Sequence, residues 1–396
     1  MSLHLLRWAV LLTALGPLVY YVLAIYCGWD FFRRVRRKSP AASSFTPPAS
    51  ILKPVRGVDR DAYENFASFC RLDYPEYEIL FAVGDADDPV IPLIEKLRRD
   101  FPQRSIHLLT SVPQLGANRK VNNLCALVRA ARHDLLVIND SDVRVEPGYL
   151  REVAAPFADP RMGAVTSFFR GLVQGSVAAA LEALVLATET VPNALVARKI
   201  EGKVQFAFGW TMATTRQHLA AIGGFEAMAN HHSDDFELGN RIAARGLRLE
   251  LLQHPVWMVF PRETLREFLG HELRWAIGLR NVRPLGYAGL LLTFGLPWAV
   301  LAALLAPSGV IAASYLAGYL FLRLLLVWTV GVWGLDDPVT RKSLWLVPLR
   351  DALNFAVWIA GFFTSKIRWR GLEFRVRKGL LVPVQDARDA QAAPRA

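Results

Sequence analysis

Apolar residues gather near the amino terminus. Residues 8–29 carry no charged side chain, and five basic residues follow between positions 33 and 38. A helix crosses the hydrocarbon core with about 20 apolar residues, and basic residues mark the cytoplasmic side of a span. We therefore predict a retained membrane anchor with its amino terminus outside. A cleaved signal peptide is the alternative, but its apolar region is shorter and ends at a small-residue cleavage site.

Apolar character returns after Pro284. Residues 285–306 and 309–333 are each long enough to span, whereas 344–363 is interrupted by residues such as Arg350 and Asp351. Because charges at membrane depth face a cavity or a protein partner, we predict that 344–363 is re-entrant or interfacial. That arrangement keeps the basic carboxyl-terminal segment inside, as the positive-inside tendency requires.

Between these ends, strand-length apolar runs alternate with amphipathic helical stretches. The runs at 49–55, 77–85, 105–110, 133–142 and 163–169 read as buried strands. Alternation with helices predicts an α/β domain with a mainly parallel, Rossmann-like sheet. The predicted units are a transmembrane anchor (1–32), a basic, proline-containing linker (33–49), a catalytic domain (50–283), a membrane region (284–365) and a basic tail (366–396).

Composition supports a membrane-attached protein with an ordinary globular part. Hydrophobic residues make up 53% and charged residues 20%, against about 45–50% and 25% in soluble domains. The net charge of +11 suits nucleic acid, an anionic membrane face or an anionic substrate, but no nucleic-acid-binding motif accompanies it. The three cysteines are too few and too scattered for a disulfide framework or a zinc cluster.

Aspartates follow two of the predicted strands. Asp140 and Asp142 close the run 133–142, after its apolar residues 135–138, and two such carboxylates can hold Mg²⁺ against a diphosphate. Asp85 follows an earlier strand and can accept hydrogen bonds from a base or ribose. The alternatives are a solvated turn at Asp140 and an Asp/Pro turn near Asp85.

Two helix starts carry further charged groups. Asp234 and Asp235 open a predicted helix; capping accounts for one of them, and the other can act as a general base. Lys120 also opens a helix, where a cation suits the helix dipole badly but suits a bound anion well. An ordinary exposed lysine is the alternative.

The segment from His271 to Trp275 reads His-Glu-Leu-Arg-Trp. Adjacent His and Glu do not share a helix face, which excludes a metalloprotease spacing. Arg274 can offer its guanidinium to a phosphate, and Trp275 a flat face to a base or sugar. An interfacial helix is the alternative for this motif. Separately, the stretches Val177–Leu195 and Phe268–Leu279 can lie along the bilayer surface, and packing in the protein core is the alternative for both.

Taken in order, these elements resemble the D, D, D, (Q/R)xxRW pattern of family 2 glycosyltransferases and their relatives, which have the GT-A fold. The chain is more similar to the ceramide glucosyltransferase family, family 21. His271 departs from the Q/R position, and the bacterial hopanoid-type N-acetylglucosaminyltransferases are similar throughout. The segments that carry the resemblance are 53–59, 72–89, 120–124, 140–145 and 369–376.

The resemblance implies a role for each matching residue. Asp85 would contact uridine, Asp140 and Asp142 the nucleotide diphosphate, and Asp142 would do so through Mg²⁺ or Mn²⁺. Lys53 and Lys120 are further nucleotide contacts. The implied catalytic set is Asp234, Asp235 as general base, His271, Arg274 and Trp275.

These inferences predict a multi-pass membrane enzyme with its catalytic domain on the cytoplasmic face. It would move a sugar, with glucose favoured, from a UDP-sugar to a lipid hydroxyl of the bilayer, with ceramide favoured and a hopanoid as alternative. A single base without a carboxylate nucleophile favours inversion. A processive polysaccharide synthase would need more spans and the Gln form of the last motif, and a non-catalytic scaffold would tolerate loss of the acids.

Overall fold

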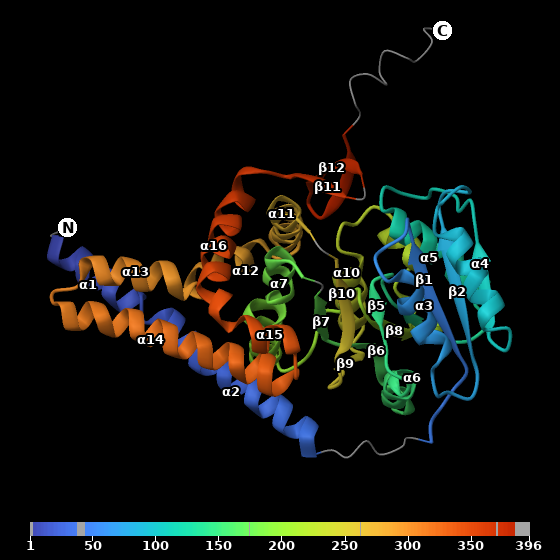
Figure 1. Ribbon diagram of the computed structural model, residues 1–396, viewed down its shortest axis with the longest axis horizontal. Coiled ribbons are helices and arrows are strands. Elements are labelled where there is room, and N and C mark those ends of the chain that lie inside the picture. The colour runs from blue at the N-terminus through green and yellow to red at the C-terminus, as the bar shows by residue number, and fades with distance from the viewer. Residues whose placement is uncertain (1–2, 38–43, 174, 262, 370, 385–396) are drawn as a thin grey trace, which may run out of the picture.

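The computed structural model describes residues 3–37, 44–173, 175–261, 263–369 and 371–384 (Figure 1). A seven-stranded sheet has the order β3-β2-β1-β4-β8-β6-β9. The four strands at one side run parallel, and β8 is antiparallel to both of its neighbours. The strands are β1 (Ala49–Val55), β2 (Tyr77–Val83), β3 (Ser105–Leu109), β4 (Leu135–Ile138), β6 (Met162–Thr166), β8 (Met212–Thr215) and β9 (Arg248–Leu251).

The predicted α/β class is confirmed, with a sheet that is rich in parallel pairs. Every residue of β1, β2 and β4 is buried, as expected for strands covered on both faces. The covering helices are α3 (Ala62–Cys70), α4 (Ile91–Asp100), α5 (Arg119–Ala130), α6 (Tyr149–Ala154), α9 (Arg216–Ala221) and α10 (Asp234–Ala244). A smaller sheet joins β5 (Val143–Arg144), β10 (Val256–Phe260) and β7 (Phe169–Val173).

Long apolar helices extend away from the sheets (Figure 1). They are α1 (Leu3–Thr13), α2 (Gly16–Arg37), α13 (Gly295–Leu305), α14 (Gly309–Val327) and α16 (Val347–Phe363). Two short helices, α12 (Pro284–Gly289) and α15 (Pro338–Ser343), precede α13 and α16 in the chain. Among the described residues, four helices are long and apolar enough to cross a membrane, and a fifth candidate is the pair 284–292 and 295–305, bent by 42°. These candidate helices fit a membrane protein. Helix α2 continues to Arg37, so the linker predicted from residue 33 begins later.

One of the four candidates, Val177–Glu201, lies mostly inside the protein. It comprises α7 (Val177–Ala183), a π-helical stretch (Leu186–Thr190) and α8 (Val191–Glu201), and 78% of its most apolar window is buried. It packs against α2, α11 (Leu265–Val282) and the π-helical stretch Trp328–Gly334. For this segment the structure favours core packing over a helix lying on the bilayer.

The polar residues that interrupt 344–363 face protein partners. Arg350 is fully buried and contacts Glu272 of α11 at 2.6 Å and Glu189 at 2.8 Å. Asp351 pairs with Arg323 of α14 at 2.5 Å. These ion pairs join α16 to its neighbours, which agrees with the expectation that charges at membrane depth are paired. The re-entrant course of 344–363 stays a prediction.

The segment predicted as a basic tail is folded up to Val384. Strands β11 (Lys366–Trp369), β12 (Leu372–Arg377) and β13 (Leu380–Pro383) form an antiparallel sheet. Phe374 and Val376 are buried against Ile277 of α11. The fold of this basic segment follows from its pattern, because every second residue of β12 is apolar and the apolar side packs on α11. Residues 385–396 lie outside the described part.

The close approach of α10 to residues 206–207 gives a test of the packing. A Cβ added to Gly239 would lie 2.4 Å from Ala207 N and Phe206 C. Overpacking a core costs about 1–3 kcal/mol, so Gly239→Ala should lower the thermal unfolding midpoint by several degrees. At Gly270 of α11 an added Cβ meets nothing within 4 Å. Gly270→Ala should keep or raise the midpoint because alanine favours helices, and equal midpoints for the two variants would contradict this packing.

Candidate active site

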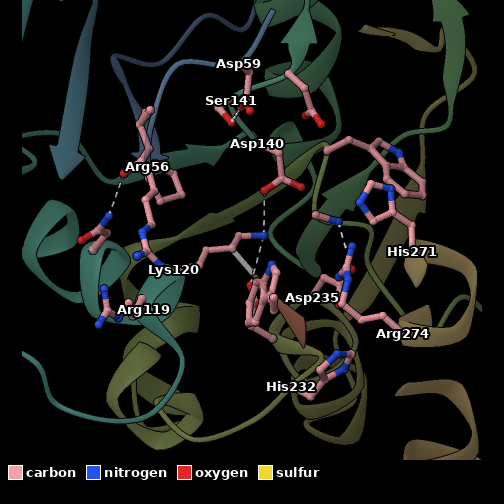
Figure 2. Close-up of a pocket in the computed structure, with 18 of the residues that line it drawn as sticks. Arg56, Asp59, Arg119, Lys120, Asp140, Ser141, His232, Asp235, His271 and Arg274 are labelled. Atoms are coloured by element: carbon pink, nitrogen blue, oxygen red, sulfur yellow. Dashed lines mark hydrogen bonds and ion pairs between the residues drawn. The ribbon is translucent and has the colours of Figure 1, made fainter. Parts of the chain in front are cut away.

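A cavity of about 620 Å³ opens at the carboxyl ends of β1, β2 and β4. This is the edge of an α/β sheet at which ligands bind. Its other walls come from α5, α10, α11 and the carboxyl-terminal sheet (Figure 2). The cavity brings together nine of the ten residues predicted from the sequence: Asp85, Lys120, Asp140, Asp142, Asp234, Asp235, His271, Arg274 and Trp275.

Lys120 holds the central carboxylates together. Its Nζ lies 2.8 Å from Asp140 Oδ1 and 3.3 Å from Asp234 Oδ2, and Figure 2 shows it pointing at Asp140. Burial opposes the charge on the ammonium, but Asp140, Asp234 and Asp235 together raise the pKa of Lys120 above its usual range. The lysine is therefore a fixed cation, and it is not the exposed residue of the alternative interpretation.

The start of α5 is fixed by a buried asparagine. Asn118 Oδ1 accepts a hydrogen bond from Val121 N at 3.2 Å, and its Nδ2 donates to His231 O at 2.8 Å. The side chain thus caps α5 and ties it to the chain just before α10. This contact sets the position of Lys120 relative to Asp234.

Asp235 is held by two main-chain hydrogen bonds and has a raised pKa. Its Oδ1 accepts from Phe236 N at 2.8 Å, and its Oδ2 accepts from Gly209 N at 3.1 Å. Burial, with the neighbouring Asp234 charge, raises the pKa of Asp235 to about 6. A carboxylate with a pKa near neutrality is ionised at physiological pH and still accepts a proton readily. Asp234 instead serves as a partner of Lys120.

Lys53 does not line the cavity. Its side chain is fully buried in β1, and its Nζ donates to Asp140 O at 2.7 Å. Burial lowers the pKa of Lys53 to about 7. The expectation of a direct nucleotide contact does not fit this place, because strand β1 is covered on both faces. Lys53 instead positions the main chain that carries Asp140.

Two aspartates of the turn after β2, Asp85 and Asp88, have different surroundings. Asp85 lines the cavity, with its Oδ2 3.9 Å from Arg119 Nη1. Asp88 accepts hydrogen bonds from Gly57 N and Val90 N, both at 3.0 Å. The Asp/Pro turn of the alternative interpretation is therefore real at Asp88, while Asp85 stays available to a ligand.

Helix α11 supplies the wall nearest the apolar helices. His271 Nδ1 lies 3.2 Å from Glu182 Oε1 and 3.5 Å from Glu263 Oε2. The Arg274 guanidinium lies 5.8 Å from the ring centre of Trp275 and 5.9 Å from that of Trp369. This arrangement places a cation between two flat faces at the cavity wall.

Several lining residues gave no sequence signal. Glu182 comes from α7, Glu263 from the loop before α11, and His232 from the loop before α10. Burial and the Arg274 charge lower the pKa of His232 to about 4, so its ring is neutral. Trp369 is a fourth such lining residue. It belongs to the segment 369–376, which resembles the family but gave no sign of a place in the site. Residues so far apart in the chain show their proximity only after folding.

The donor set at the end of β4 fits a divalent cation. Asp140 and Asp142 present carboxylate oxygens at the cavity wall, and Mg²⁺ prefers one or two carboxylates plus phosphate oxygens. Gly209 leaves room beside them, since a Cβ there would lie 2.9 Å from Asp140 Oδ2. One oxygen of Asp140 already faces Lys120, so Asp142 is the better placed ligand.

Comparison with known proteins decides the family. The profile described as "Glycosyl transferase family 21" matches residues 5–382. The chain belongs to glycosyltransferase family 21. Its fold is that of a GT-A enzyme: over 89% of this chain and 99% of the other, it is similar to a mannosyltransferase from Pyrobaculum calidifontis solved with GDP-Man and Mn²⁺, with a TM-score of 0.53 and 18% identity.

Curated relatives of this family 21 glycosyltransferase extend over most of its length. Ceramide glucosyltransferase 1 of Caenorhabditis elegans is 25% identical over 88% of this chain and 76% of the relative. Ceramide glucosyltransferase 3 of the same organism is 23% identical over 91% of this chain and 79% of the relative.

Removal of the Lys120 ammonium tests the charge balance of the site. Lys120→Met leaves Asp140 and Asp234 without their shared cation, a loss of about 3 kcal/mol for a buried pair. The Lys120 charge also lowers the pKa of the neighbouring Asp235, so without it Asp235 takes up a proton at a higher pH, and the repulsion among the carboxylates is relieved as pH falls. We expect the unfolding midpoint to drop more at pH 8 than at pH 5.5. Lys96→Met, at an exposed position of α4, is the control, and a pH-independent loss in Lys120→Met would contradict the charge balance.

Proposed function

We propose that this glycosyltransferase moves a sugar, with glucose favoured, from a UDP-sugar to the hydroxyl of a membrane lipid, with ceramide favoured. The observation that carries the proposal is the composition of the cavity walls. Carboxylates at the ends of β2 and β4 form one side, and α11, which packs against α16, forms another. A polar donor and a lipid acceptor can meet only where a polar site adjoins the bilayer. The names of the curated relatives support this choice of acceptor.

The proposed reaction is a single displacement. The lipid hydroxyl gives its proton to an oxygen of Asp235 while its oxygen attacks the anomeric carbon of the sugar. The bond from that carbon to the UDP oxygen breaks, and UDP leaves with the electron pair. Arg274 offsets the charge that grows on the diphosphate. One displacement inverts the configuration at the anomeric carbon.

Asp142, with Asp140 beside it, would hold the divalent cation. Mn²⁺ in the similar mannosyltransferase structure and the hard oxygen donors of this chain support Mg²⁺ or Mn²⁺. When bound, the cation neutralises charge on the diphosphate. Lys120 cannot replace it, because its ammonium is already committed to Asp140 and Asp234. We also propose that the catalytic domain lies on the cytoplasmic face, which the basic residues flanking the helices support.

Product analysis tests the substrates. Purified enzyme in lipid is incubated with UDP-glucose, UDP-galactose or UDP-N-acetylglucosamine and with ceramide or a hopanoid polyol. We expect a mass increase of one hexose on ceramide with UDP-glucose. A product formed only from UDP-N-acetylglucosamine and the hopanoid would replace the acceptor and donor named here. No glycolipid from any pair would contradict transfer to these lipids.

Substitution of Asp235 tests the base. Asp235→Asn should lower kcat by about 10²–10⁴-fold, the usual contribution of a general base, while the Kd for the UDP-sugar changes little. In the wild type, kcat/KM should fall tenfold per pH unit below about pH 6, because the base of the free enzyme must be deprotonated and its pKa is about 6. Glu237→Gln, on the same helix and paired with Arg241 at 2.9 Å, should keep the wild-type profile. Near-normal turnover in Asp235→Asn would remove Asp235 as the base.

Metal removal tests the role of Asp142. EDTA should abolish transfer, and added Mg²⁺ or Mn²⁺ should restore it. Asp142→Asn should raise the cation concentration needed for half-maximal activity at least tenfold, because a carboxylate ligand is lost. Full activity of the wild type in metal-free buffer would contradict this assignment.

A further inference from the structure

Two glutamates and a histidine meet at the α11 wall of the cavity. Glu182 lies on α7, Glu263 in the loop before α11, and His271 on α11, and one ligand atom from each lies within 4.8 Å of the other two. All three line the same cavity as the aspartates. Figure 2 shows His271 apart from Asp140 and Lys120, so this group is separate from the carboxylates at the end of β4.

The burial of this group calls for a counter-charge. The side chain of Glu182 is 7% exposed and that of Glu263 is 4% exposed. Apart from the neighbouring Glu182 carboxyl, neither carboxylate oxygen of Glu263 has a hydrogen-bond partner among the described residues. Two carboxylates held together away from water are costly unless a positive charge or a proton lies between them. The geometry of the histidine decides which of these fits best.

The distances from His271 to the two glutamates match the distances between neighbouring ligand atoms around a bound metal ion. A charge-assisted N–H···O bond measures about 2.7–2.9 Å, but Nδ1 of His271 lies 3.2 and 3.5 Å from the two glutamate oxygens. For a tetrahedral ion with ligands at about 2.0–2.2 Å, adjacent ligand atoms are separated by about 3.4 Å. The separation of 3.2 Å from Glu182 also allows a hydrogen bond, but both separations from His271 match those of neighbouring ligands around one ion.

We propose that Glu182, Glu263 and His271 form a second divalent-cation site, of the Zn²⁺ or Mn²⁺ class. Imidazole nitrogen with two carboxylate oxygens is a donor set that these ions accept. Three protein ligands leave a position open towards the cavity, where an oxygen of a substrate or a water can bind. The site rests on its own geometry and not on the proposed sugar transfer.

Pulsed electron paramagnetic resonance of bound Mn²⁺ tests the site directly. An imidazole ligand couples its nitrogen to the Mn²⁺ electron spin, and the carboxylates of Asp140 and Asp142 do not. Full-length enzyme is freed of metal in detergent and loaded with Mn²⁺ alone. We expect nitrogen modulation in the wild type and in Asp142→Asn, and its loss in His271→Ala.

A matched histidine controls for non-specific binding. His254 pairs with one carboxylate, that of Glu152 at 2.8 Å, so His254→Ala should keep the nitrogen signal. Glu263→Gln, which preserves the side-chain shape, should weaken Mn²⁺ binding at this site at least tenfold and decides the matter if His271→Ala does not fold. Nitrogen modulation that is missing from the wild type, or that persists in folded His271→Ala, overturns the proposal. A proton is then the counter-charge of the two glutamates.

Discussion

The candidate site depends on one buried ammonium group. Nζ of Lys120 joins the end of β4 to the start of α10, through Asp140 and Asp234. Three carboxylates so close together would repel one another without this cation. Because Lys120 takes up the charge of two of them, Asp235 can remain beside them with a pKa near neutrality. Because the Lys120 ammonium is paired with these carboxylates, a metal ion and Arg274 neutralise the diphosphate charge in the proposed reaction.

A second set of ion pairs connects the site to the apolar helices. Arg350 of α16 contacts Glu272 of α11 and Glu189 of the helix formed by Val177–Glu201. Glu272 stands next to His271, so this buried contact fixes the helix that also carries Arg274. Paired charges in an apolar surrounding have few alternative partners, and they therefore specify one arrangement of the helices. The polar cavity is held against the apolar helices in this way.

Local patterns in the sequence predicted much of the fold and part of the site. Strand-length apolar runs predicted the parallel-rich sheet, and acids directly after strands or at helix starts predicted the cavity at its edge. Lys53 was misjudged because a lysine inside a strand gives no sign of which way its amine reaches. Glu182 and Glu263 carry no local signal, since only the packing of α7 against α11 brings them together. The carboxyl-terminal sheet was not predicted, because its strands are short and its basic residues drew attention only to the charge of the segment.

The most direct test of the account is the structure of the full-length enzyme in a lipid nanodisc with UDP and Mn²⁺. We expect a diphosphate at the end of β4, with Mn²⁺ bound by Asp142, the guanidinium of Arg274 on the phosphates, and the uracil ring near Asp85. Asp235 should face the empty sugar position. A nucleotide bound outside this cavity, or a diphosphate that contacts neither Asp142 nor Arg274, would contradict the central claim.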